Sequence, residues 1–274
     1  MLKIIKESFR LTNNYLMIAT PLILFSLITS LYLIFSAGGS RFGLLLTLIL
    51  LFLMLGAFLS GWFYMITKAV KDSPEITKDY SFLSEFMTGV GEYFFNILGF
   101  IVITAAVSSG IVILSILAGK SLIGNPGVTY AQVSSAAASI EAMKAFSDSL
   151  TNEQILKINC WNILLLLTMI FNYLVIMLYA PAMYFKNKNP FVALWLNIKD
   201  LFSRRFFKNI GMFLILFVSY FILSMLNAFF GSNIICHFVL TLVNFYYVTF
   251  AAILLFNYYY SNFAKIGSEI DEVV

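Results

Sequence analysis

Cys236 and His237 are adjacent, and this pair is where the sequence comes nearest to a metal site or an activated nucleophile. Zinc takes three or four protein ligands, and His237 is the sole histidine of the chain, so the pair is too small for a zinc site. The chain also lacks a second histidine that could act as a general base. Neither a G-x-x-x-x-G-K phosphate loop nor an H-E-x-x-H motif occurs. We therefore predict a protein that is not an enzyme and needs no cofactor or metal.

Uncharged polar residues interrupt the apolar stretches, and Asn172 and Asn244 lie nearest the middle of theirs. Such residues could line a polar cavity. Hydrogen bonds between helices, each contributing about 0.6 to 2 kcal/mol, explain them as well. The second interpretation is favoured, and Asn172 and Asn244 stay the candidates if a cavity exists. No charged residue lies inside a predicted span, which argues against a proton- or sodium-coupled pump.

The composition places these residues in a membrane protein. Of 274 residues, 61% are hydrophobic and 11% are charged, whereas soluble domains carry about 25% charged residues. Between Lys208 and Lys265 the chain runs for 56 residues without Asp, Glu, Lys or Arg. That stretch is too long and too apolar for a soluble core, and it is typical of two membrane-spanning helices joined by a turn.

The charge-free intervals predict an all-α polytopic membrane protein with six transmembrane helices, since a helix needs about 20 apolar residues to cross the hydrocarbon. We treat residues 1–274 as a single transmembrane domain, with one long outer loop over residues 119–159. The predicted spans cover residues 15–37, 43–67, 93–118, 160–185, 209–230 and 235–262.

The distribution of Lys and Arg predicts the orientation. Thirteen of them flank the ends of the spans on one side, and four lie on the other. This places both termini in the cytoplasm and the protein in the inner (plasma) membrane. The net charge of +4 arises mostly from residues that flank apolar spans, so the chain has no basic stripe for nucleic acid.

The outer loop carries its own structural signals. Residues 124–127 (Gly-Asn-Pro-Gly) predict a turn, and residues 132–144 predict a helix because they are rich in alanine. Thr151 begins a second helix, which we expect to lack a full capping box. The loop is either a connection or a binding element, and the sequence leaves both open.

Proline and small residues predict how the helices bend and pack. Pro181 has no amide hydrogen and should kink span four. In span two, Gly56 with Ser60 and Ala57 with Gly61 stand four residues apart, and similar pairs follow in span three. Small residues at this spacing let helix backbones approach closely, so we expect spans two and three to pack in the bundle.

A threefold internal repeat is predicted, each copy consisting of an amphipathic stretch, a span out, a turn and a span back. Leu2, Ile5 and Phe9 share one helical face before span one. A shorter apolar pattern over residues 82–88 precedes span three. These stretches are expected to lie in the headgroup plane as interfacial helices.

The third amphipathic stretch is the most complete. It begins with Asn189 as cap and Pro190 in the first turn. Its apolar face consists of Phe191, Leu194, Trp195, Ile198 and Phe202, and its water-facing side is expected to consist of Lys199, Asp200, Ser203 and Arg204. The basic residues in and around it could contact anionic lipid, although the same charges would also serve to set the topology. They are Lys186, Lys188, Lys199, Arg204, Arg205 and Lys208.

Several of these features together resemble a known family. Residues 7–10 (Glu-Ser-Phe-Arg) lie in the first basic stretch, residues 179–182 (Tyr-Ala-Pro-Ala) end span four, and residues 189–194 (Asn-Pro-Phe-Val-Ala-Leu) follow. This order is similar to that of poorly characterised bacterial six-helix proteins related to the membrane domain of glycerophosphoryl diester phosphodiesterases. The resemblance implies a fold but no activity, because the phosphodiesterase chemistry belongs to a separate soluble domain.

Two hypotheses for function follow. The first is a non-enzymatic integral membrane protein that interacts with membrane lipids or with a membrane-protein partner. The alternative is a transporter or permease subunit for a lipid-like or amphipathic solute. A water-accessible cavity near Asn172 and Asn244 would favour the second hypothesis, and a tightly packed interior would favour the first.

Overall fold

The computed structural model describes residues 1–36, 41–72 and 82–264. Within these ranges every regular element is a helix and none is a strand, which confirms the predicted all-α fold. Six helical stretches are long and apolar enough to cross a membrane, so the chain is a multi-pass membrane protein. They are Leu16–Ile34, Gly43–Lys71, Ser84–Leu122, Asn152–Phe185, Phe206–Phe230 and Ile234–Ala264.

The chain forms two compact units. The first comprises Met1–Ile103 and Val175–Val274, and the second comprises Thr104–Leu174. Whether residues 1–274 act as a single transmembrane domain stays a prediction. Lys78 and Lys265, which contribute to the predicted orientation, lie outside the described residues.

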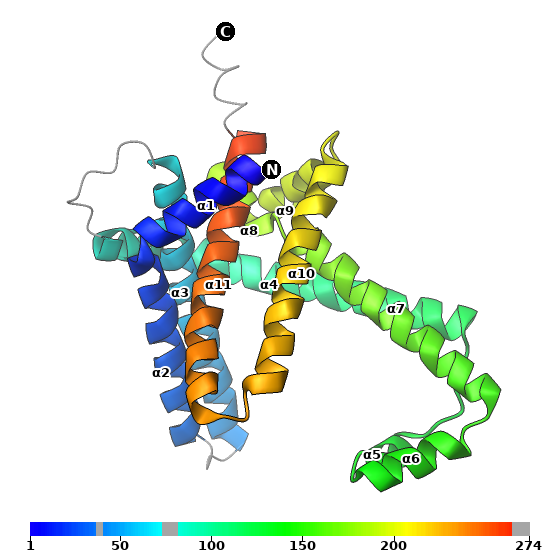
Figure 1. Cartoon of the computed structure of the whole chain (residues 1–274). Coiled ribbons are helices and arrows are strands. Elements are labelled where there is room, and N and C mark those ends of the chain that lie inside the picture. Colours follow the sequence, from blue (N-terminus) through cyan, green and yellow to red (C-terminus); the bar gives the residue numbers. More distant parts are fainter. Residues whose placement is uncertain (37–40, 73–81, 265–274) are drawn as a thin grey trace. The chain divides into compact units, whose positions relative to one another are not determined.

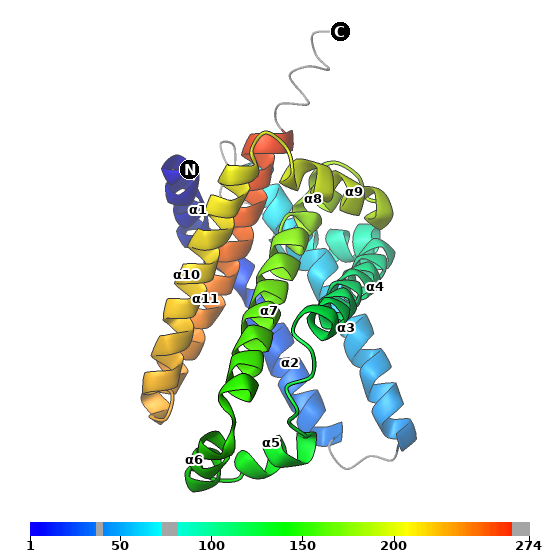
Figure 2. The same ribbon diagram turned by 90° about the vertical axis from the view of Figure 1, so that its right-hand side faces the viewer.

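The first unit holds most of the helices. Their bounds are α1 (Leu2–Asn14), η1 (Leu16–Ala19), α2 (Thr20–Ser36), α3 (Arg41–Lys71), the first part of α4 (Phe82–Leu122), α8 (Tyr179–Phe185), α9 (Pro190–Leu201), α10 (Phe206–Phe230), α11 (Ile234–Tyr259) and η2 (Tyr260–Ala264). In Figures 1 and 2, α1, α8 and α9 lie at the same end of this unit as the start of α10 and the end of α11. We call this the α9 end.

The core of the first unit lies at the α9 end, around the last turns of α11. Leu254, Tyr258 and Tyr259 are buried there against Ala182 of α8 and Met212 of α10. Along the rest of the spans many large apolar side chains are exposed, as expected for helices whose solvent is lipid.

Helix α1 packs against α11, which it crosses in Figure 1. Asn257 donates a hydrogen bond to the Ser8 hydroxyl over 3.1 Å, and the Tyr246 hydroxyl donates to the Asn13 side chain over 2.7 Å. The first helix of the chain is thus held by the last long one.

The amphipathic stretches do not all form separate helices. A 3₁₀ turn, η1, separates α1 from α2, and residues 202–205 separate α9 from α10. The stretch before span three, in contrast, is the beginning of α4, which runs without a break from Phe82 to Leu122. No proline interrupts this run, so nothing forces the helix to end. The threefold repeat stays a prediction.

Span four is broken, as its proline predicts. Two residues, Met177 and Leu178, separate the end of α7 (Asn152–Ile176) from the start of α8 at Tyr179. Pro181 lies in the first turn of α8, where its missing amide hydrogen costs no helical hydrogen bond.

Small residues bring α3 and α4 together. A Cβ atom added to Gly61 would lie 2.6 Å from the Phe86 ring, and one added to Gly56 would lie 2.5 Å from Leu98. On α4, a Cβ atom at Gly89 would lie 2.8 Å from the backbone oxygen of Ser60. The close approach predicted at Gly56 and Gly61 of span two is confirmed, whereas Ala105, Ala106 and Ser109, the small residues predicted to pack in span three, are exposed. Gly110 does not take part, since no described atom outside its own helix turns lies within 4 Å of its added Cβ.

The second unit contains the loop between α4 and α7, with helices α5 (Tyr130–Ala136) and α6 (Ile140–Ser149). Gly124 and Gly127 both have positive φ, which confirms the turn predicted there. The helix predicted over residues 132–144 is divided at residues 137–139, because Ser139 accepts a hydrogen bond from Ala142 and starts a new helix.

The start of α7 corrects one prediction. Gln154 donates its backbone N–H to the Thr151 hydroxyl over 3.3 Å, and its side-chain oxygen accepts the Thr151 N–H over 2.9 Å. This is a full capping box, with glutamine in the third helical position, so the prediction of an incomplete box was wrong.

Candidate functional site

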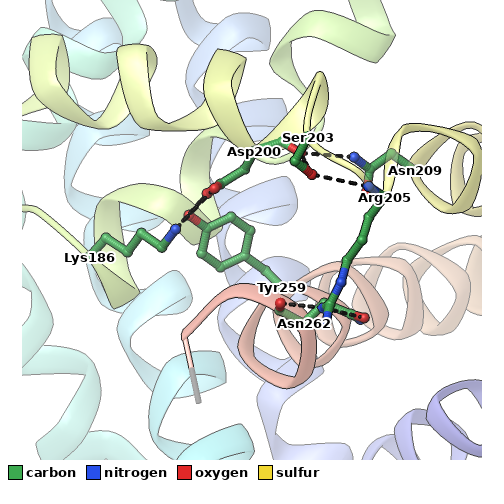
Figure 3. A network of polar contacts seen from close by, with 7 residues as sticks. All are labelled: Lys186, Asp200, Ser203, Arg205, Asn209, Tyr259 and Asn262. Carbon is green, nitrogen blue, oxygen red and sulfur yellow. Dashed lines mark hydrogen bonds and ion pairs between the residues drawn. The ribbon is translucent and has the colours of Figure 1, made fainter. Parts of the chain in front are cut away.

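Asp200 is the centre of a buried polar cluster at the α9 end (Figure 3). Its side chain is 11% exposed. The carboxylate accepts hydrogen bonds from Lys186 Nζ at 2.8 and 3.0 Å and from the Tyr259 hydroxyl at 2.5 Å. A buried carboxylate needs such donors, because an unpaired charge away from water is costly. The Asp200 cluster consists of Lys186, Asp200, Ser203, Arg205, Asn209, Tyr259 and Asn262.

The start of α9 determines which side chains face the protein. The Asn189 side chain accepts the Phe191 N–H over 3.0 Å, and Pro190 occupies the first helical position. From this start, the small and polar side of the helix becomes the buried one. Its buried residues are Ala193, Asn197, Asp200 and Leu201. The prediction that Asp200 lies on a water-facing side was therefore wrong.

The aromatic side of α9 is exposed. Phe191 is 72% exposed, Trp195 68% and Phe202 57%. Large aromatic side chains at the end of membrane-spanning helices favour the interface between headgroups and hydrocarbon. Helix α1 shows the same arrangement, with Ser8 buried and Phe9 exposed.

Asn209 of α10 holds the end of α9 through hydrogen bonds to its last carbonyl groups. Its amide donates to the backbone oxygen of Asp200 over 3.1 Å and to that of Leu201 over 2.9 Å. The Tyr258 hydroxyl donates to the Asn209 side-chain oxygen over 2.7 Å. The last carbonyl groups of a helix have no partner within it, and here a neighbouring helix supplies one.

Arg205 joins the α9–α10 connection to η2. Its guanidinium donates to the Asn262 side-chain oxygen over 2.8 Å and to the Asn262 backbone oxygen. The guanidinium also lies 5.7 Å from the centre of the Phe263 ring, within the range of a cation–π contact. Two cations thus share the Asp200 cluster with one carboxylate, so the cluster carries a net positive charge.

A second, more exposed ion pair connects the α8–α9 loop to α4. Lys188 Nζ lies 2.8 Å from Glu92 and 4.7 Å from the centre of the Tyr93 ring. Asn96 donates to the Lys188 backbone oxygen over 2.9 Å. The hydrogen bond to Glu92 raises the pKa of the Lys188 ammonium above its ordinary value.

The six basic residues predicted to contact lipid fall into two groups. Lys186, Lys188 and Arg205 bind side chains of the protein itself, as described above. The other three are exposed, and the described ranges give them no ion pair or side-chain hydrogen bond: they are Lys199, Arg204 and Lys208. Contact with anionic lipid stays a prediction for all six, and these last three have charges available for it.

The candidate cavity residues lie in different units. Asn244 donates to the Leu240 backbone oxygen over 2.9 Å and to the Asn227 side-chain oxygen over 3.3 Å. The buried side-chain oxygen of Asn172 has no hydrogen-bond partner among the described residues. Asn244 therefore fits the interpretation as a hydrogen bond between helices, and a polar cavity at either residue stays a prediction.

An apolar groove of about 370 Å³ lies between α2 and α3, with Phe86 of α4 at one side. Among the described residues that line it, Thr20 alone has a polar side chain. Such a groove suits hydrocarbon.

Sequence reasoning missed the partners of the Asp200 cluster. One signal could have revealed its centre, because Asp200 is the only acidic residue between Glu153 and Glu269. A lone carboxylate among many cations is a candidate for internal pairing. Tyr259 and Asn262 give no such signal, since each is one polar residue in a long apolar stretch.

Among the residues that the structure describes, no three His, Cys, Asp or Glu side chains gather where they could hold a metal ion. Comparisons with protein-family models, with curated proteins and with solved structures found no match to this chain. The resemblance to the membrane domain of glycerophosphoryl diester phosphodiesterases therefore stays an expectation from sequence.

Proposed function

We propose that this chain is a non-enzymatic integral membrane protein that holds anionic lipid at its α9 end. The observation that carries the proposal is the orientation of α9, which is opposite to the one expected for a helix on a soluble protein. This helix turns its acidic residue into the protein and its aromatic side chains outward, beside the exposed charges of Lys199, Arg204 and Lys208. An aromatic surface flanked by available cations suits a membrane interface that is rich in anionic headgroups.

The proposal includes a place in the cell. The α9 end lies in the cytoplasmic leaflet of the plasma membrane, and both termini are cytoplasmic. The excess of Lys and Arg in the flanks of the spans supports this orientation. It also agrees with the lipid partner, because the cytoplasmic leaflet carries a negative surface potential.

Native mass spectrometry from nanodiscs tests the proposal. The protein is placed in equimolar phosphatidylglycerol and phosphatidylcholine, and the retained lipids are identified. We expect the wild type to retain phosphatidylglycerol preferentially. The triple variant Lys199→Gln, Arg204→Gln, Lys208→Gln should lose this preference by about two orders of magnitude, at about 1 kcal/mol for each basic residue.

A matched control removes charge elsewhere. Lys120→Gln with Lys144→Gln neutralises two exposed lysines of the second unit, and this variant should retain phosphatidylglycerol as the wild type does. Equal retention of both lipids by the wild type would contradict the proposal.

A further inference from the structure

A cavity of about 310 Å³ opens at the α9 end where α1, α10 and η2 meet. Met1, which precedes α1, and Ile4 of α1 form one wall, and Phe207 of α10 forms another. Helix α11 packs against both α1 and α10 in the first unit (Figure 1). These three side chains make the walls of the cavity apolar.

The volume of this cavity depends on Gly211. Gly211 of α10 lines the cavity, and a Cβ atom added there would lie 3.5 Å from the Met1 side chain. One methyl group therefore fits in ordinary contact, whereas a larger side chain would occupy the cavity.

The polar part of the cavity suits an anion. Lys208 lines the cavity, and its ammonium group has no ion pair within the described ranges. Asn262 also lines the cavity, but its side-chain oxygen already accepts from Arg205 and its amide donates to a backbone oxygen. Tyr258 also lines the cavity, and its hydroxyl already donates to the Asn209 side-chain oxygen. None of the described lining residues is acidic, so Lys208 is the side chain left to bind an anionic ligand.

We propose that this cavity binds one anionic phospholipid, with its phosphate on Lys208 and its glycerol and first acyl carbons against Met1, Ile4 and Phe207. A free phosphate ion would leave the three apolar walls in contact with water, whereas a phospholipid covers them. The site rests on the proposed function and makes it specific, because it assigns one bound lipid to one place.

The experiment tests the charge of Lys208 and the volume of the cavity in separate variants. Native mass spectrometry from the same nanodiscs is applied to Lys208→Gln, Gly211→Leu and Gly211→Ala. We expect about fivefold weaker retention of phosphatidylglycerol by Lys208→Gln. Gly211→Leu keeps every charge but fills the cavity, so it should lose the lipid. Gly211→Ala adds one methyl group at an ordinary contact distance and should keep it.

Each outcome decides between the proposals. Loss of the lipid in Gly211→Leu together with retention in Gly211→Ala supports the site, provided that both variants keep the unfolding temperature of the wild type. If Gly211→Leu fails to fold, Lys208→Gln alone decides, because it adds no bulk. Undiminished retention by Lys208→Gln, or displacement of the lipid by excess inorganic phosphate, overturns the site. A wild type with no preference for phosphatidylglycerol sinks the proposed function itself.

Discussion

The partly buried carboxylate of Asp200 is held by the side chains of Lys186 and Tyr259. Lys186 supplies an opposite charge, and the Tyr259 hydroxyl donates a short hydrogen bond. Such an arrangement is sensitive to the loss of one member, because the remaining charge is then left partly buried without a partner.

We predict that Asp200→Ala lowers the free energy of unfolding by about 2 to 4 kcal/mol. The double variant Lys186→Met with Asp200→Leu should recover part of this loss, because it removes both charges together. Equilibrium unfolding in mixed micelles measures both values. A loss in Asp200→Ala no larger than that in Glu92→Ala, which breaks an exposed ion pair, would contradict the central role of Asp200.

The second ion pair predicts a dependence on pH. The pKa of Lys188 is raised above 10.5 in the folded state. A raised pKa stabilises the fold fully below the unfolded value, and this contribution is lost as pH rises through the folded value. The unfolding temperature of the wild type should therefore exceed that of Glu92→Gln up to about pH 10.5 and converge with it above. The difference in unfolding temperature is small, because the side chains of Lys188 and Glu92 are 54% and 44% exposed. Exposed ion pairs contribute at most about 1 kcal/mol.

At the scale of the elements, the crossing of α3 and α4 depends on glycine. Gly89 faces the backbone of α3, whereas a Cβ atom added to Gly91 meets no described atom within 4 Å. We predict that Gly89→Ala destabilises the protein by about 1 to 3 kcal/mol, because backbone must move. Gly91→Ala, two residues further along the same helix, should be neutral or stabilise by up to about 1 kcal/mol. Unfolding of both variants in mixed micelles checks the difference, and equal effects would show that the crossing tolerates a side chain.

Helix α9 shows what a periodic pattern can and cannot predict. Its spacing correctly placed Phe191, Trp195 and Phe202 together on one side. A soluble helix buries its apolar side, but a helix at a membrane surface has protein, lipid and water as neighbours. The sequence therefore predicted the aromatic side, yet it could not predict that Asp200 packs against protein while Lys199 and Arg204 stay exposed.

The partners of the basic residues could not be predicted from the sequence either. The spans could be predicted because charge is excluded from the hydrocarbon over about 20 residues, which is a local property. The partner of Lys188 lies 96 residues away in the chain, and that of Arg205 lies 57 residues away. Such distances depend on how the helices pack, so sequence alone could not separate paired from available cations.

At the scale of the whole molecule, the proposed orientation predicts which surfaces a reagent reaches from outside the cell. In a variant with Cys160 and Cys236 replaced by serine, a single cysteine at Lys144 should react with a membrane-impermeant maleimide on intact cells. A single cysteine at Lys199 should react only after the membrane is permeabilised. Labelling of Lys199→Cys on intact cells would reverse the orientation.

The contact between α1 and α11 has a consequence for the order of assembly during synthesis. Ser8 meets its partner Asn257 across 249 residues of chain. The ribosome therefore synthesises these 249 residues before α1 gains its docking surface. Until then we expect α1 to lie on the membrane surface, because its exposed Phe9 suits the interface. A nascent chain that stops before α11 leaves α1 undocked and Asp200 without Tyr259, and it is a natural target for membrane quality-control proteases.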